Sequence, residues 1–307
     1  MKARPFLVMV LVGACAFAAV WLGASKMGRA RETAAGARPR IVSLSPAITE
    51  TLFALGVGDT VVGVTSRCDY PPEVAKIARV GAGTHPDMEA IARLEPTMIL
   101  GEPTLRLSEE MLAPLAPTHL LPWLTASEIV RGVREIGALV DRRPEAEALA
   151  GRMERRWSVA PSANAPRVLM LLADQPGRVG PIYFVKPGSL HDTLLTAAGG
   201  RNAIEGTVRG VPTLSIEELL RLDPDAIVLL VANNELPPET RDRFVADFRS
   251  FPSLHAVRND RVRVLHGDIL FVTGPRVLAV IDRVADALRD MGLSGAADGR
   301  MELQGRP

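Results

Sequence analysis

The sequence has few cysteines, and its histidines are scattered. Of the two cysteines, Cys15 lies inside an N-terminal apolar run and only Cys68 lies outside it, so the rest of the chain cannot form an internal disulfide. No two of the five histidines have the helical or hairpin spacing of metal ligands, which favours structural or surface roles for them. We therefore predict no metal site.

The local signatures of common enzymes are also absent. The chain contains no G-x-S-x-G sequence, no P-loop and no dinucleotide-binding fingerprint, and nothing in it requires catalysis. We predict no catalytic residues. Lysine and arginine together number 36 and the acids 35, so no charge asymmetry points to nucleic acid as a partner.

A long apolar run does occur, but only at the N-terminus. Lys2 and Arg4 precede the run 6–24, and basic residues follow it, as in an export signal or a membrane anchor. As a helix the run would reach about 28 Å, just enough to cross a bilayer core, so a cleaved signal and a retained anchor both fit. Cys15 stands in a segment that loosely resembles a lipoprotein cleavage box, although the run continues past it. We assign residues 1–39 to this signal or anchor and a tether, and expect a periplasmic or extracytoplasmic protein that the leader could hold at the membrane.

One stretch of the chain occurs twice. Residues 88–100 read MEAIARLEPTMIL and residues 216–228 read IEELLRLDPDAIV, at a constant offset of 217 − 89 = 128 residues. Each copy has the pattern of an amphipathic helix that ends at a proline and is followed by a buried strand. Two such units so far apart predict two similar lobes, and two-lobed α/β proteins commonly bind ligands in the cleft between the lobes.

The predicted fold class is α/β, with two similar lobes, mainly parallel central sheets and one long helix joining them. Strands are predicted at 41–44, 61–64, 98–100, 119–121, 167–172, 226–231 and 262–265. Helices are predicted at 45–55, 125–140, 144–160, 190–198, 240–249 and 276–291. We place the N-terminal lobe at 40–140, the linker helix at 141–162, the C-terminal lobe at 163–292 and a tail at 293–307.

Three features could carry a binding function. Ser45-Pro46-Ala47 stands where a strand ends and a helix begins, with free backbone N–H groups at the carboxyl edge of the sheet; Ser45 caps the helix and could also contact a ligand. Asp69-Tyr70 belongs to a rigid turn whose ring either faces a ligand or pins the loop. Glu89 and Glu217 begin the repeated helices, where the helix dipole, solvation or a partner with two basic pockets could explain them.

Six segments in order resemble one family, the iron-chelate and vitamin B12 periplasmic-binding proteins of ABC importers. The segments are LSPAITETLFALG, VVGVTSRCDYPPEV, MEAIARLEPTMIL, GSLHDTLLTAAGGRNAI, VPTLSIEELLRLDPDAIVL and TGPRVLAVIDRVADAL. The resemblance covers residues 40–288. It implies two lobes joined by one rigid helix, a shallow cleft for a large chelate and little closure on binding. It also implies that Glu89 and Glu217 dock with arginines of a permease dimer.

Departures from the family pattern bear on the ligand. The tryptophans of the vitamin B12 binding protein are replaced here by Gly83 or Thr84 and by Ile269, and no aromatic stands at 211–213, so an aromatic cage for a corrin is largely missing. The tyrosine that ligates haem iron in relatives falls near Ala82. Cationic Arg67, Lys186 and Arg209 would suit an anionic ferric siderophore, or are plain surface charge. The residues predicted to contact the ligand are Ser45, Pro46, Ala47, Arg67, Tyr70, Thr84, Phe184, Arg209 and Asp268.

The resulting prediction is a monomeric substrate-binding protein of an ABC importer, without a resident cofactor. It would capture a metal chelate, a ferric siderophore ahead of cobalamin, in the cleft and deliver it to a permease dimer. Two alternatives stay open: an enzyme on the same bilobal scaffold, with Asp268 and His266 in the cleft, and a tethered partner-binding protein without a small ligand.

Overall fold

The computed structural model describes residues 38–160, 162–177 and 182–293. The predicted signal or anchor at 6–24 and most of the tail lie outside these residues. The described residues from 41 onward belong to one compact unit. Within the described ranges, no helix is long and apolar enough to cross a membrane.

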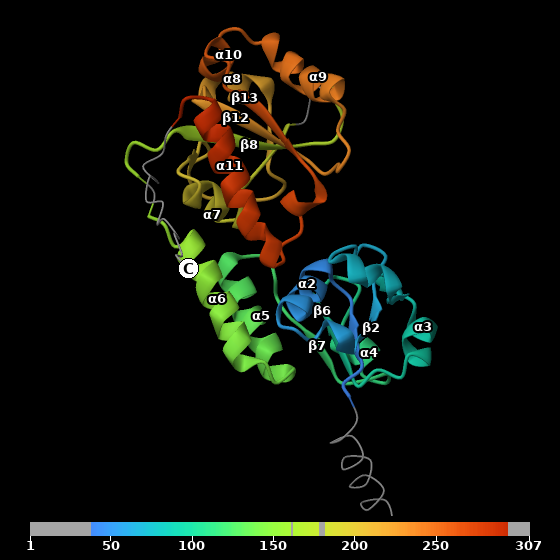
Figure 1. The fold of residues 1–307 in the computed structure, drawn as a ribbon. Helices are drawn as coiled ribbons and strands as arrows, with labels where there is room; N and C mark the ends of the chain where they lie inside the picture. Colours follow the sequence, from blue (N-terminus) through green and yellow to red (C-terminus); the bar gives the residue numbers. More distant parts are fainter. Residues whose placement is uncertain (1–37, 161, 178–181, 294–307) are drawn as a thin grey trace, which may run out of the picture. The chain divides into compact units, whose positions relative to one another are not determined.

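The first sheet is entirely parallel and has the strand order β3-β2-β1-β6-β7 (Figure 1). Its strands are β1 (Ile41–Ser43), β2 (Val61–Val64), β3 (Ala78–Arg79), β6 (Met98–Gly101) and β7 (Thr118–Leu120). The four strands predicted in this lobe are confirmed, and β3 is added at the edge beside β2. Central β1 is completely buried, as its apolar sequence requires.

The helices of this lobe are α2 (Pro46–Ala54), α3 (Met88–Arg93) and α4 (Glu109–Leu112), with a small hairpin of β4 (Gly81–Ala82) and β5 (His85–Pro86). Ser45 caps α2 and Pro46 takes its first position, as predicted. Gly56 follows the helix with φ +74°, a conformation that a residue without Cβ adopts without strain.

The second sheet repeats this plan with an antiparallel addition. Its order is β11-β9-β8-β12-β13, and β10 also pairs with β8. The strands are β8 (Arg167–Ala173), β9 (Ile182–Phe184), β10 (Arg201–Asn202), β11 (Thr213–Leu214), β12 (Ala226–Val231) and β13 (Val262–His266). The pairs β8–β9 and β9–β11 are antiparallel, and the rest are parallel. The strands β9, β10 and β11 were not predicted from the sequence.

The helices of the second lobe are α7 (Leu190–Ala197), α8 (Ile216–Leu222), α9 (Pro238–Arg249), α10 (His255–Arg258) and α11 (Leu278–Asp290). On the last helix, Ile281, Val284 and Leu288 are buried. One turn of 3-10 helix, Pro275–Val277, precedes α11, so the last helix begins two residues later than predicted.

The sequence repeat corresponds to a structural repeat. Both copies place a short helix before a strand that pairs with the central strand of its sheet, α3 before β6 and α8 before β12. Glu95 and the matching Asp223 both have positive φ, 43° and 40°, directly before a proline. A proline disfavours right-handed helical geometry in the residue before it, which ends each helix at this point, and the two residues share the same left-handed conformation.

The connection between the sheets consists of two helices, α5 (Ala126–Leu139) and α6 (Arg143–Trp157). A capping box of Thr125 and Glu128 begins α5, and α6 buries Leu149, Met153 and Trp157. Gly137 lets the helices approach, because a Cβ there would lie 2.2 Å from that of Ala146. Arg134 clamps the carboxylates of Glu147 and Glu154 at 2.8–2.9 Å, which lowers the pKa of both acids.

Candidate functional site

The loop between β1 and α2 uses its hydroxyl group internally. Ser45 is only 3% exposed; its Oγ accepts a hydrogen bond from the N–H of Ile48 at 3.4 Å and donates one to Glu102. Ala47 is buried as well, so of the predicted Ser45-Pro46-Ala47 contact only Pro46 has appreciable exposure. Capping is therefore the observed role of Ser45.

Glu102 shows that this carboxyl edge is an unusual electrostatic environment. It directly follows β6, the strand beside β1, and so meets Ser45 at the same edge of the sheet. Burial raises the pKa of the Glu102 carboxyl, and the hydrogen bond from Ser45 only partly opposes this effect.

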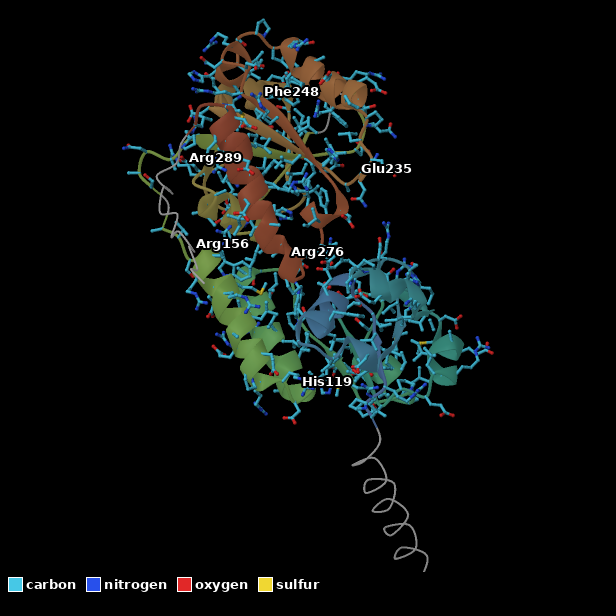
Figure 2. All side chains as sticks on the ribbon, in the orientation of Figure 1. His119, Arg156, Glu235, Phe248, Arg276 and Arg289 are labelled. Atoms are coloured by element: carbon cyan, nitrogen blue, oxygen red, sulfur yellow. The ribbon has the colours of Figure 1, made fainter. Side chains whose placement is uncertain are left out.

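A buried ion pair joins the two lobes. Glu50 lies on α2 of the first lobe and Arg276 on the turn before α11 in the second (Figure 2). Both Nε and one terminal nitrogen of Arg276 donate to Oε1 of Glu50, at 2.9 and 2.5 Å. The Glu50 side chain is 3% exposed, and its Oε2 is buried without a hydrogen-bond partner. Burial raises the pKa of Glu50, against the opposing effect of Arg276.

Tyr70 and its neighbours close around this pair. The Arg276 guanidinium carbon stands 3.9 Å from the centre of the Tyr70 ring, a cation–π contact between the lobes. A small hollow forms at this point, lined by Pro46, Glu50, Arg67, Asp69, Tyr70, Asp268, Val272 and Arg276. Four of the residues predicted to contact a ligand, Pro46, Arg67, Tyr70 and Asp268, thus converge here.

Thr84 lies close to the same loop but outside the hollow. It is exposed in the turn of the β4–β5 hairpin, beside Gly83. A Cβ on Gly83 would stand 2.6 Å from the carbonyl oxygen of Leu44, so the hairpin turn rests directly on the residue before Ser45. Thr84 therefore lies near the carboxyl edge of the first sheet, and its contact with a ligand stays a prediction.

Phe184 and Arg209 are not brought to the hollow. Phe184 is 4% exposed and packs in the core of the second lobe, so its ring is not available to a ligand. This corrects the prediction; the neighbouring Tyr183 is 44% exposed instead. Arg209 is exposed in the loop before β11, and Lys186 is partly exposed in the turn before α7. Neither contributes to the lining of the hollow.

Sequence reasoning missed Glu50 and Arg276, although both stand in segments that carry the family resemblance. The available signal was Glu50 itself, a lone acid in the otherwise uncharged helix PAITETLFA. A buried acid requires a partner, but the partner is 226 residues away and no local pattern identifies it. A second interlobe contact was also missed, the hydrogen bond from Trp123 Nε1 to the carbonyl of Thr273 at 3.0 Å.

Glu89 and Glu217 occupy equivalent exposed places. Each is the second residue of its helix, after the caps Asp87 and Ser215. Glu89 is paired with Arg93 at 2.8 Å, but its side chain remains 80% exposed. Both carboxylates are therefore accessible on the surface, far along the chain from each other but matched in local structure.

The described residues contain no group of three or more histidine, cysteine or acidic side chains arranged to hold a metal ion. His266, considered as a partner of Asp268, hydrogen-bonds through Nδ1 to the carbonyl of Asn233 at 3.2 Å and does not line the hollow.

Comparison with known proteins agrees with this geometry. The family model "Periplasmic binding protein" matches residues 41–269. The vitamin B12-binding protein of Photorhabdus laumondii is 24% identical over 261 residues, which cover 82% of this chain and 89% of that protein. Among solved structures, an ABC transporter substrate-binding protein from Listeria monocytogenes superposes with a TM-score of 0.67 at 25% identity, covering 83% of this chain and 100% of that one.

A haem-binding protein, RhuT from Roseiflexus, superposes with a TM-score of 0.64 at 26% identity, covering 83% of this chain and 99% of that one. The family match takes in both sheets, the two-helix connection and Asp268, so it includes every described strand and most of the hollow. The chain therefore belongs to the periplasmic binding protein family.

Proposed function

We propose that this chain is the substrate-binding protein of an ABC importer and captures a metal chelate between its lobes. The observation that carries the proposal is the hollow at the Glu50–Arg276 pair, where residues from the carboxyl edges of both lobes converge in a chain of this family. The known relatives are binding proteins, and this favours capture and delivery over chemistry on the ligand.

The ligand we propose is a ferric siderophore, with cobalamin as the second candidate. The relative from Photorhabdus is named for vitamin B12 and the one from Roseiflexus for haem, so large metal chelates are the class to consider. Tyr70 is the one aromatic ring among the described residues of the hollow. A single ring favours a chelate held by charge over a corrin held by stacking, and Arg67 offers a cation that is not paired with Glu50.

Titration of the protein from residue 40 onward with candidate chelates tests this proposal. Trp123 reports on the lobe interface because its indole contacts Thr273, so its fluorescence is expected to change when a ligand enters the cleft. We expect ferric hydroxamate and catecholate siderophores to bind, and Arg67→Ala to weaken the binding of the anionic ones about tenfold, or about 1.4 kcal/mol. Arg152→Ala, an exposed change on α6, is the control. Failure of siderophores, cobalamin and haemin alike to bind would refute chelate capture.

We further propose that Glu89 and Glu217 dock this protein onto the permease dimer. The support is their equivalent position at the start of the repeated helices and their exposure. Reversing both charges, Glu89→Lys with Glu217→Lys, is expected to abolish transport while leaving chelate affinity within twofold. Glu239→Lys, another exposed glutamate in the first turn of a helix, is the matched control. Uptake at the unaltered rate in the double variant would exclude this docking surface.

A further inference from the structure

A groove runs along the outer edge of the second sheet, at strand β13. It has a volume of about 560 Å³ and is lined by four residues each of α9, β13 and α11, together with Asp260. Neither Glu217 nor any residue of the hollow at Glu50 belongs to this lining. The edge groove, as we call it, is therefore separate from both sites of the proposed function.

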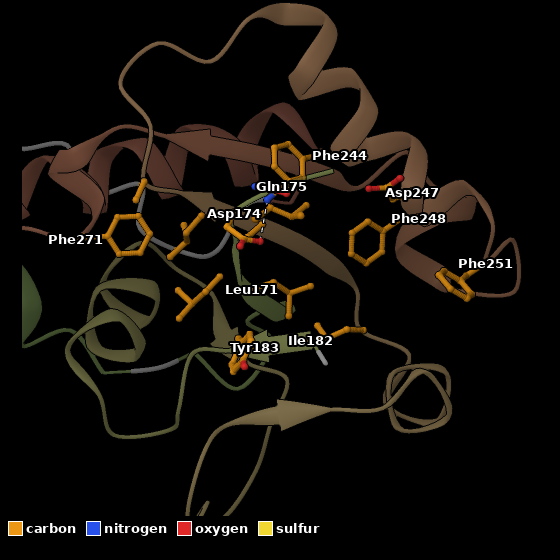
Figure 3. A pocket seen from close by; sticks show the side chains of 15 residues that line it. Leu171, Asp174, Gln175, Ile182, Tyr183, Phe244, Asp247, Phe248, Phe251 and Phe271 are labelled. Carbon is orange, nitrogen blue, oxygen red and sulfur yellow. Dashed lines mark hydrogen bonds between the residues drawn. The ribbon is translucent and has the colours of Figure 1, made fainter. Parts of the chain in front are cut away.

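The two helices that line the edge groove cover opposite faces of the sheet. Phe244 and Phe248 of α9 point toward the sheet (Figure 3), where they share a buried cluster with Leu229 of β12. Val284 of α11 shares another buried cluster with Leu230, the next residue of β12, which points to the other face. The walls of the groove are therefore α9 on one side and α11 on the other, and β13 forms the floor between them.

The floor of the edge groove is an edge strand with backbone groups that point outward. β13 pairs with β12 on one side only. Ile227 donates its N–H to the carbonyl of Arg261, and Gly267 donates its N–H to the carbonyl of Val231. In a parallel pair this pattern directs the odd-numbered residues of β13 toward β12 and the even-numbered ones away from it. The N–H and C=O of Val264 therefore point into the groove.

Arginines cover the outward carbonyls on either side of Val264. Arg263 donates to the carbonyl of Val262 at 3.0 Å, and Arg283 donates to that of His266 at 2.6 Å. Among the described residues no side chain covers Val264 in this way. The other end strands of the two sheets, β3, β7 and β11, have two or three residues, whereas β13 has five. An unpaired strand of this length is a template for a further strand.

Two charges in the edge groove have no partner among the described residues. Its lining contains four arginines and four aspartates. Most of them are used internally: Arg241 pairs with Asp242, Arg263 with Asp260 and Asp286 with Arg289, while Arg283 bonds to the His266 carbonyl. The side chains of Arg249 on α9 and Asp290 on α11 remain. Asp290 is the last residue of its helix, where the helix dipole disfavours an acid, so the dipole does not explain it.

These two free charges face the same part of the groove from opposite walls. The carbonyl of Asp290 accepts a hydrogen bond from Arg263 at 3.3 Å, so α11 ends beside the start of β13. Arg249 is the last residue of α9, and a helix that connects two parallel strands runs back along them, so it ends there as well. Successive side chains of an extended segment on β13 would point first to one wall and then to the other.

We propose that the edge groove binds one extended segment of a partner protein, which adds a strand to β13 and carries an acidic residue next to a basic one. The acid pairs with Arg249 and the base with Asp290, while the backbone of the segment bonds to Val264. A second copy of this lobe would bring its own α9 and α11 into the layers that these helices already occupy. A single segment brings no helices, and for this reason the occupant is a segment.

The charge pattern is tested with the end-blocked, fluorophore-labelled peptide Thr-Val-Glu-Lys-Val-Thr and the chain from residue 40 onward. Fluorescence anisotropy should show that it binds at least threefold more tightly than the versions with Lys-Lys or Glu-Glu at its centre. In Arg249→Glu both free charges are acidic, so the Lys-Lys peptide should become the tightest ligand. Arg243→Glu, an exposed arginine on the same helix but outside the groove, is the control and should leave the order of the peptides unchanged.

The backbone contact is tested at Val264. Val264→Pro removes the outward N–H, at a position where an edge strand tolerates proline, and should weaken binding of the Glu-Lys peptide at least tenfold. Val264→Thr keeps the N–H and should change affinity less than threefold. Should Val264→Pro fail to fold, the Glu-Lys peptide N-methylated at every residue replaces it and should bind the native chain at least tenfold more weakly.

Four results would overturn the proposal. They are no binding of the Glu-Lys peptide to the native chain, an unchanged order of the peptides in Arg249→Glu, and equal binding by Val264→Pro and Val264→Thr or by the methylated and unmethylated peptides. The fourth is a dimer of the native chain in light scattering that Val264→Pro dissociates, because the occupant would then be a second copy.

Discussion

The ion pair between Glu50 and Arg276 predicts a marked asymmetry between substitutions of its two members. In Arg276→Met, the Glu50 carboxylate loses both side-chain donors to Oε1 and the positive charge beside it, and Oε2 has no hydrogen-bond partner. The side chain is 3% exposed, so water cannot replace the arginine. Removing one member of a buried pair costs about 3–5 kcal/mol, and we expect a loss of about 4 kcal/mol at pH 8.

The reverse change should cost less. In Glu50→Gln the amide oxygen can still accept a hydrogen bond from Arg276. The arginine side chain is 22% exposed and keeps its contact with the Tyr70 ring, so it is not left desolvated. We expect a loss of about 1–2 kcal/mol. The apolar double variant Glu50→Leu, Arg276→Met leaves no charge buried. This double variant should therefore be more stable than Arg276→Met alone, with a coupling energy between the two positions of at least about 2 kcal/mol.

The pH dependence provides an independent check on the sign. Burial raises the folded-state pKa of Glu50 above its ordinary value of 4.5. A raised carboxyl pKa contributes stability at pH values below the unfolded pKa, and that contribution is lost as the pH rises through the folded pKa. Arg276 opposes the shift, so its removal raises the pKa further. The deficit of Arg276→Met should therefore be largest at pH 8 and shrink toward pH 4.5.

Urea unfolding measured by tryptophan fluorescence and circular dichroism at both pH values gives these free energies, provided that the two transitions coincide. Equal losses in Arg276→Met and Glu50→Gln, or a deficit that does not change between pH 8 and pH 4.5, would refute the reasoning.

Three further predictions follow from local contacts. Gly137→Ala should lower the free energy of unfolding by about 1–3 kcal/mol in thermal unfolding, because its Cβ would meet that of Ala146 at 2.2 Å. Gly151→Ala on the same pair of helices meets only the flexible Arg155 side chain, at 3.3 Å, and should gain up to about 1 kcal/mol. Equal effects of the two changes would contradict the close helix approach. Glu102→Gln should unfold at a higher temperature than the native chain at pH 8 and at the same temperature near pH 4. The reason is that burial raises the pKa of Glu102, so the native chain loses stability as the pH rises through that pKa. A variant that is less stable than the native chain at pH 8 would show that the hydrogen bond from Ser45 dominates. Trp123→Phe should cost about 1–2 kcal/mol in urea unfolding through the bond to Thr273, and no loss would show that this interlobe bond is not stabilising.

The sequence predicted the main elements of the fold because their signals are local. Val61–Val64 and Ala226–Val231 are short apolar runs between turn residues, and both are strands with the predicted bounds. The helix predicted at 125–140 is α5, with Thr125 as its cap and its last residue one position earlier than predicted. The elements that were missed, such as β10 and β11, have two residues each and no periodicity to detect.

The candidate site was predicted only in part, for a different physical reason. Tyr70 was identified because it stands in a recognisable turn, and Asp268 through the family resemblance; the structure brings both to the hollow. The pair at its centre depends on a contact between residues 226 positions apart, and such a contact leaves no trace in the spacing of either segment. A lone acid in an apolar helix indicates that a partner exists, but it does not identify that partner.

Phe184 was predicted to be exposed to a ligand but is buried, whereas the adjacent Tyr183 is exposed. On β9 successive side chains point to opposite faces, so Phe184, opposite Leu171, enters the core, while Tyr183, opposite Leu172, points to the other face and is 44% exposed. Only the pairing of β9 with β8 decides which face is which, and the sequence of this segment does not contain that register. The exposed ring of β9 is therefore Tyr183, one residue before the predicted Phe184, because the alternation of side chains along the strand gives only one of two adjacent aromatic residues to solvent.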